Sequence, residues 1–159
     1  MNTASKMVVS KMYRGINMKK IVIVYWSGTG NTKAMAEAVA DGAKNEHTVV
    51  SLLSVAEASI DDIKNADAVA IGCPSMGAEV LEEEEMEPFV VSIEDIVTGK
   101  PMALFGSYGW GNGEWMQDFV ARMTKCGAKV LGEGLITMNM PDDQGIKESQ
   151  SLGNELSKA

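Results

Sequence analysis

An apolar run at residues 20–25 (KIVIVY) leads directly into a loop of small and hydroxyl residues, 27–32 (SGTGNT), and then into a helical pattern. At the start of a helix, free backbone N–H groups and the helix dipole attract a phosphate, and glycines let the backbone wrap closely around it. The loop contains no Lys or Arg and matches neither GxxxxGK[ST] nor GxGxxG. A neutral lining of this kind predicts a single monoester phosphate, although the loop alone is also compatible with an ordinary turn.

Short apolar runs alternate with helical patterns along the rest of the chain. Strands are predicted at 20–25, 48–53, 67–72, 101–106 and 128–137, and helices at about 31–44, 60–65, 84–97, 113–126 and 142–158. The strands are apolar on both faces, which is typical of a parallel sheet covered by helices on each side. Right-handed crossovers then predict an α/β fold, a doubly wound five-stranded parallel sheet with strand order 2-1-3-4-5. In this fold the ligand binds at the carboxyl ends of the strands, beside the loops that follow strands one, three and four.

The charge of the chain is uneven. The formal net charge is −8, but residues 1–17 hold three of the 14 Lys and Arg residues and no acid, so residues 18–159 carry −11. We expect residues 1–17 to be a poorly ordered extension and residues 18–159 to form one domain. So acidic a domain disfavours nucleic acid and anionic membranes and favours basic protein surfaces, although solubility alone would also explain the charge. The two separated cysteines predict neither a disulfide framework nor a zinc site, which points to a reducing cytoplasm.

The two other loops at the predicted ligand edge are also rich in glycine. The loop after strand three is CPSMGAE (73–79), and the loop after strand four is SYGWGNG (107–113). A flat aromatic ligand sandwiched between Met76 and Trp110, with its edge held by Glu79 and backbone amides, would use both loops together.

Three segments, VYWSGTGNT, GCPSMGAEVLEE and LFGSYGWGNGEWM, resemble the FMN-binding segments of the flavodoxins, in particular of the short-chain subclass. The resemblance runs from about Met18 to the C-terminus and implies noncovalently bound FMN, whose 5′-phosphate would occupy the first loop. The cofactor-binding residues that it implies are Ser27, Gly28, Thr29, Gly30, Asn31, Thr32, Pro74, Ser75, Met76, Gly77, Ala78, Glu79, Ser107, Tyr108, Gly109, Trp110 and Gly111.

The resemblance also implies roles for individual residues. Met76 and Trp110 would pack on opposite faces of the isoalloxazine ring, and Glu79 would accept a hydrogen bond from flavin N3–H. The carbonyl of Gly77 would turn toward flavin N5 when that atom is protonated. Ala78 stands where such loops often carry a small polar or acidic residue, and this difference bears on the reduction potential.

We therefore expect a cytoplasmic, monomeric, low-potential one-electron carrier that binds FMN and no metal. Its partners would be reductases and other oxidoreductases with basic docking surfaces. One alternative is a flavodoxin-like FMN-dependent NAD(P)H:quinone reductase, which would need a nicotinamide pocket. Another is a non-redox signalling domain, which would need an aspartate at the end of strand three, where Gly72 and Cys73 stand. The acidic run at 82–87 is interpreted as either a solvated helix start or a docking rim beside the flavin.

Overall fold

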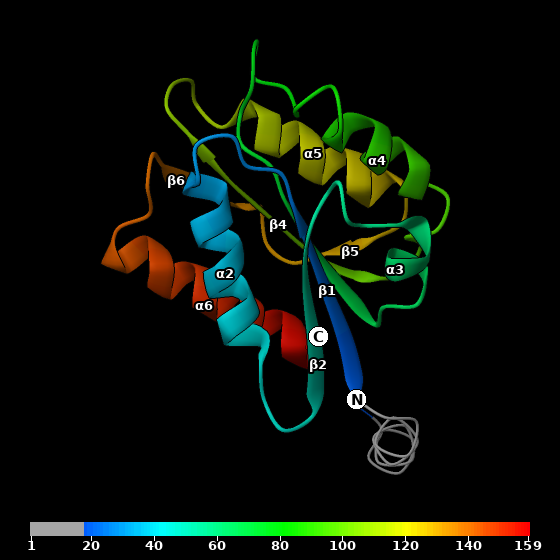
Figure 1. Cartoon of the computed structure of the whole chain (residues 1–159). Coiled ribbons are helices and arrows are strands. Elements are labelled where there is room, and N and C mark those ends of the chain that lie inside the picture. Colours follow the sequence, from blue (N-terminus) through cyan, green and yellow to red (C-terminus); the bar gives the residue numbers. More distant parts are fainter. Residues whose placement is uncertain (1–17) are drawn as a thin grey trace.

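A parallel sheet forms the centre of the structure, with helices on both of its faces (Figure 1). The computed structural model describes residues 18–159, and the extension predicted at residues 1–17 lies outside this part of the chain. The strands are β1 (Lys19–Tyr25), β2 (Thr48–Ser54), β3 (Ala68–Gly72), β4 (Pro101–Tyr108), β5 (Lys129–Val130) and β6 (Leu135–Met138). They are ordered β2-β1-β3-β4-β5, with β6 also paired to β4, and every pair is parallel. The predicted strand order 2-1-3-4-5 is confirmed.

The fifth position of the sheet differs from the prediction in one respect. The predicted continuous strand at 128–137 is two short strands in tandem, β5 and β6, which pair with opposite ends of β4. Between them, Gly132 and Gly134 have φ angles of 64° and 85°. These left-handed conformations carry the chain out of the ladder before it returns.

Five helices flank the sheet within the described residues. They are α2 (Asn31–Ala43), α3 (Ile60–Lys64), α4 (Met86–Ile93), α5 (Glu114–Lys125) and α6 (Asp143–Lys158). Helices α2 and α6 pack against each other on one face, and α4 and α5 lie over the other (Figure 1). A β-carbon at Gly153 of α6 would overlap the carbonyl oxygen of Val39 in α2, so the close packing of these helices requires a glycine there.

The alternation of side chains along β1 explains the two hydrophobic cores. Ile21 and Ile23 are fully buried in the core formed with α2 and α6, whereas Val22 and Val24 are buried in the core formed with α4 and α5. Successive strand residues point to opposite faces, so one apolar run supplies both cores. Burying each of these side chains contributes about 1.5–3 kcal/mol.

Two element boundaries differ from the predictions in ways that matter for the ligand edge. Strand β4 continues to Tyr108, so Ser107 and Tyr108 end a strand instead of starting a loop. The helix predicted at 84–97 is shorter, because α4 begins at Met86 and ends at Ile93. Residues 82–85 therefore form a turn that leads into the helix, and their carboxylates differ in their exposure to solvent.

Candidate functional site

The loop between β1 and α2 leaves hydrogen-bond donors free at the start of the helix. Gly30 is the N-cap of α2, with φ 95°, and no side chain caps the helix there. The Ser27 hydroxyl oxygen accepts from the N–H groups of Gly30, at 3.1 Å, and Lys33, at 3.3 Å. Within residues 18–159, the N–H groups of Asn31 and Thr32 form no hydrogen bond with a protein acceptor. The loop can therefore donate to an anion, as its sequence predicts.

Two of the three hydroxyls expected around a phosphate already have partners in the protein. Ser27 holds the loop, as described, and Thr32 is buried, with its Oγ1 atom 2.9 Å from Oγ of Ser107. The N–H group of Ser107 also donates to Oγ1 of Thr32, at 3.3 Å. Thr29 is exposed, and within the described residues its hydroxyl forms no hydrogen bond. The structure thus brings the first and third loops together through Thr32 and Ser107.

The loop after β3 is closed by a short bridge. The backbones of Met76 and Val80 exchange two hydrogen bonds of 2.9 Å, which enclose Gly77, Ala78 and Glu79 in a tight turn. Gly77 has φ 50°, and no atom lies within 4 Å of the place where a β-carbon would stand. Gly77 and Ala78 are exposed at the tip of this turn. This leaves the Gly77 carbonyl free to face a ligand.

Ser75 carries a buried hydroxyl that residues 18–159 leave without a hydrogen-bond partner. Its N–H group donates to the carbonyl oxygen of Ser107, at 3.0 Å, which joins the second loop to β4. Its hydroxyl oxygen is buried and has no hydrogen-bond partner, the one such side-chain atom among the described residues. Buried polar atoms are rarely left unpaired, so a bound ligand is the natural partner for this hydroxyl.

Glu79 joins the second loop to the third. Its Oε1 atom accepts hydrogen bonds of 3.2 Å from the N–H groups of Asn112, Gly113 and Glu114. Gly113 is the N-cap of α5 and has no side chain to cap the helix, so Glu79 supplies the cap from another loop. The residues around Glu79 do not predict this role. The sequence feature that could have indicated a cap from elsewhere is a helix that starts after a glycine, with no Ser, Thr, Asp or Asn at the cap position.

The aromatic side chain of the third loop, Trp110, is exposed to solvent. Trp110 is 52% exposed, whereas Trp115 is 1% exposed. The Trp115 indole N–H donates to the carbonyl oxygen of Cys73, at 3.0 Å, and its ring lies 5.7 Å from that of Tyr108. Trp115 is therefore part of the core, and Trp110 is the aromatic side chain of the third loop that is available to a ligand.

The acidic run at 82–87 contains a buried member. Glu82 is 6% exposed, and its carboxylate accepts from the N–H groups of Glu84, Glu85 and Met86 at 2.7–2.9 Å. Burial opposes ionisation of Glu82, but these three donors outweigh it and hold the pKa of the carboxyl below its ordinary value. Glu82 thus organises the turn into α4, while Glu83, Glu84 and Glu85 are exposed.

Cys73 and His47 have no place in the chemistry of the site. Burial raises the pKa of the Cys73 thiol to about 12, so the thiol is neutral at physiological pH and behaves as a small apolar group. His47 is exposed at the start of β2, away from the three loops. Among residues 18–159, no group of three His, Cys, Asp or Glu side chains is arranged to hold a metal ion.

The fold and this edge define an α/β protein of the doubly wound class, with an uncapped helix start after β1 and an exposed indole in the loop after β4. The family profile described as Flavodoxin matches residues 23–150. The chain is 50% identical over 121 residues to a flavodoxin of Clostridium beijerinckii, covering 76% of this chain and 88% of that one. It is 40% identical over 139 residues to a flavodoxin of Megasphaera elsdenii, covering 87% and 99%. The solution structure of the two-electron reduced Megasphaera elsdenii flavodoxin superposes with a TM-score of 0.80, again covering 87% of this chain and 99% of that one.

The chain therefore belongs to the flavodoxin family. It binds FMN and transfers electrons to and from redox proteins, and it is an electron-transfer protein, not an enzyme. These relatives favour neither the quinone-reductase alternative nor the signalling alternative. In the part of the chain that the structure describes, no helix is long and apolar enough to cross a membrane.

The residues at the edge of the sheet fit FMN on structural grounds. The unpaired N–H groups at the start of α2 suit its phosphate, and the exposed face of Trp110 suits its ring. The unpartnered hydroxyl of Ser75 suits one of its polar atoms.

Proposed function

We propose that the three loops at the carboxyl edge of the sheet form the FMN site, with the residues predicted from the sequence in the roles given above. Residues 27–32 would hold the 5′-phosphate, residues 74–79 and 107–111 would enclose the flavin ring, and Met76 and Trp110 would lie on its two faces. The proposal is supported above all by the unpartnered, buried hydroxyl of Ser75, a residue of the second loop whose N–H group donates to the carbonyl oxygen of Ser107.

The loops are held in position before a ligand arrives. Hydrogen bonds join the Thr32 side chain to that of Ser107, and the Ser75 N–H group to the Ser107 carbonyl. The Glu79 carboxylate accepts hydrogen bonds from the start of α5. Positioning of this kind lowers the entropic cost of binding. The remaining oxygen of Glu79, Oε2, is the one that we propose accepts from flavin N3–H.

FMN supplies the one-electron chemistry, and this chain supplies binding, orientation and electrostatics. Residues 18–159 have 11 fewer basic than acidic side chains. Such a surplus of negative charge, together with the phosphate, opposes the addition of another negative charge and favours a low potential.

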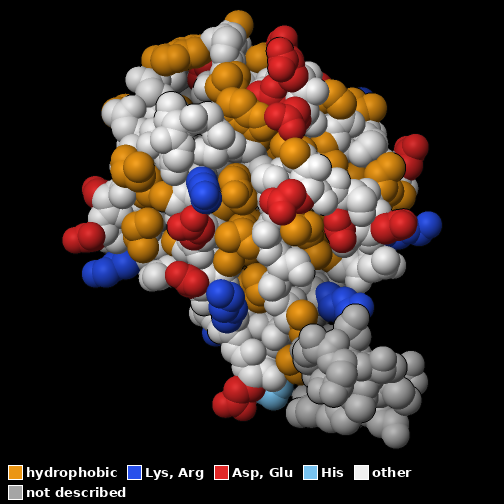
Figure 2. All heavy atoms as spheres, viewed as in Figure 1, with side chains coloured by type: hydrophobic (Ala, Val, Ile, Leu, Met, Phe, Trp, Pro, Cys, Tyr) orange, Lys and Arg blue, Asp and Glu red, His pale blue; other side chains and the backbone are white. Residues whose placement is uncertain are grey.

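We further propose that the protein works as a monomer in the cytoplasm and docks on basic surfaces of its redox partners. Both cysteines are free thiols, which suits a reducing compartment. Asp and Glu side chains stand among hydrophobic ones at the top of the molecule, around the loops at the carboxyl edge of the sheet (Figure 2). Electron transfer with a basic c-type cytochrome should then slow steeply as salt rises, and a rate that is flat between low and physiological salt would argue against this docking mode.

Comparison of FMN with riboflavin tests the phosphate loop. Thr29→Val removes an exposed hydroxyl that has no partner among the described residues, so it should weaken FMN binding by about 0.5–1.5 kcal/mol and leave riboflavin binding unchanged. Thr124→Val, at the far end of α5, is the matched control and should change neither affinity. Equal losses for both flavins would show that residues 27–32 do not contact the phosphate.

A further inference from the structure

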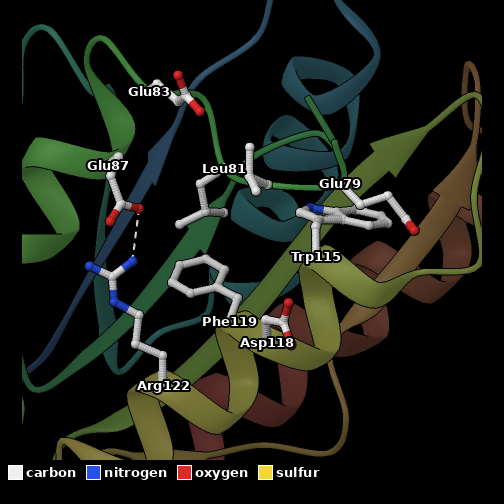
Figure 3. Close-up of a pocket in the computed structure, with 9 residues that line it drawn as sticks. Glu79, Leu81, Glu83, Glu87, Trp115, Asp118, Phe119 and Arg122 are labelled. Carbon is white, nitrogen blue, oxygen red and sulfur yellow. Dashed lines mark hydrogen bonds and ion pairs between the residues drawn. The ribbon is translucent and has the colours of Figure 1, made fainter. Parts of the chain in front are cut away.

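A concave feature lies beside the proposed flavin loops, between residues 79–87 and helix α5. It is a groove of about 510 Å³. Leu81, Trp115 and Phe119 form its apolar floor, and the carboxylates of Glu83, Glu87 and Asp118 stand around it (Figure 3). Of the residues that line the groove, only Glu79 has a role in the proposed FMN site.

The charge of the groove is negative. Arg122 is the one basic residue that lines it. The Arg122 guanidinium is engaged by two carboxylates, Glu87 at 2.8 Å and Glu94 at 3.2 Å. Glu83 and Asp118 are exposed and form no ion pair within residues 18–159. Two carboxylates without an ion-pair partner in this part of the chain therefore line a groove that has an apolar floor, and this arrangement suits a cation.

This combination fits the side chain of a lysine or arginine. Such a side chain has an apolar stem and a charged tip, and it buries the stem while the tip stays polar. A guanidinium also binds carboxylates in a fixed, forked geometry. Nucleic acid, phosphate and other anions are disfavoured by the same carboxylates.

The groove is connected to the proposed flavin loops through two residues. Glu79 lines the groove and belongs to the turn at 76–80, and its carboxylate caps α5. Trp115 lines the floor and donates to the carbonyl oxygen of Cys73, where that loop begins. A group bound in the groove would therefore lie next to the loops that hold the cofactor.

We propose that this groove receives a lysine or arginine side chain from the basic surface of the redox partner and so fixes the partner beside the flavin. This inference rests on the proposed docking to basic partners, and it adds the place of docking. The rate of electron transfer to a basic partner should therefore depend on where an acidic group lies, and not only on the total charge.

The test compares two variants that lose equal charge. In FMN-loaded full-length protein, Glu83→Gln with Asp118→Asn removes the two uncompensated carboxylates of the groove. Glu37→Gln with Glu155→Gln removes two exposed carboxylates from α2 and α6, on the opposite face of the sheet. The measurement is the second-order rate of electron transfer to a basic c-type cytochrome at low salt.

We expect the groove variant to react about tenfold more slowly than the wild type, which corresponds to two exposed ion pairs. The control variant should react at least threefold faster than the groove variant. FMN affinity should be the same in all three proteins, which separates this result from any failure of the proposed cofactor site. Equal slowing of both variants would overturn the proposal, because net charge alone would then explain docking. It would also be overturned if the wild type formed a dimer in sedimentation and the groove variant did not, because the groove would then hold a second copy of the chain.

Discussion

The side-chain oxygens of Thr32 and Ser107 lie 2.9 Å apart in the protein interior, although 75 residues separate them in the chain. Thr32 is in the first turn of α2, and Ser107 is next to the end of β4. Their hydrogen bond joins the proposed phosphate loop to the proposed ring-binding loop. The geometry of the site therefore depends on a contact that belongs to neither loop alone.

Mutation of this pair should reveal coupling between the two loops. Thr32→Val and Ser107→Ala should each lower the free energy of unfolding by about 1–2 kcal/mol, because each leaves a buried hydroxyl unpaired. The double variant should lose less than the sum of the two. Urea unfolding of the four proteins gives the coupling energy, and strict additivity would mean that the hydrogen bond contributes nothing.

Trp110→Ala should weaken FMN binding without harming the fold. The indole is 52% exposed, so its loss removes little buried area, but loss of stacking should cost about 1–3 kcal/mol of binding free energy, by analogy with base–aromatic stacking. Fluorescence titration of the apoprotein with FMN measures this loss. Unchanged affinity would remove Trp110 from the cofactor site. Trp115→Phe is the contrasting variant, because it should lower the stability of the apoprotein, through the lost hydrogen bond to Cys73.

Gly77→Ala should lower the potential of the first one-electron step. No atom would obstruct the β-carbon, so the cost is that of a left-handed backbone, about 1–2 kcal/mol. We expect the Gly77 carbonyl to accept a hydrogen bond from flavin N5–H only after reduction. The oxidised variant can then leave the left-handed backbone conformation, whereas the reduced variant cannot. The potential should then fall by roughly 40–90 mV, while affinity for oxidised FMN changes little. A spectroscopic redox titration checks this, and an unchanged potential would leave Gly77 as a turn residue only.

The Glu82 carboxylate should make the free energy of unfolding depend on pH. Its pKa is lower in the folded protein than its ordinary value, so its contribution is fully present above the ordinary pKa and is lost as the pH falls through the folded pKa. At pH 7, Glu82→Ala should lower the free energy of unfolding by about 1–3 kcal/mol, because three backbone N–H groups lose their acceptor. The difference from the wild type should shrink as the pH falls below the ordinary range of a glutamate.

Glu83→Ala is the control for this prediction. Glu83 is exposed and accepts no hydrogen bond from the described residues, so its removal should change the stability by less than about 0.5 kcal/mol. A pH-independent difference for Glu82→Ala would contradict the capping role.

The two cysteines should differ in their reactivity toward alkylating reagents. The pKa of Cys73 is raised to about 12 by burial, and its side chain is fully buried, whereas Cys126 is half-buried at the end of α5. Because the thiolate is the reactive form, iodoacetamide at pH 8 should modify Cys126 first. Mass spectrometry of the native protein checks the order, and the unfolded protein should show no preference. Faster modification of Cys73 would mean that the loop at 73–79 opens readily.

The sequence by itself determined the sheet and its strand order, and it predicted the edge at which we propose the site lies. Apolar, β-branched runs such as residues 20–25 alternate with helical patterns, and the handedness of the crossovers then leaves few arrangements. The three loops that follow strands one, three and four must meet at one edge in that arrangement. The glycines and hydroxyls at 27–32 and the resemblance to flavodoxins indicated the ligand, which family membership now supports.

Only the tertiary structure decided how the side chains of these loops are used. Glu79 caps a helix 35 residues further along the chain, Thr32 bonds to Ser107, and Glu82 is a buried cap within a run that looks uniformly solvated. The tandem strands β5 and β6 replaced one continuous strand because two left-handed glycines interrupt the pairing. The roles of Glu79, Thr32 and Glu82 share one physical reason. Each depends on which groups the folded chain leaves without a hydrogen-bond partner, and that is set by how the strands, helices and turns pack, not by a local pattern of residues.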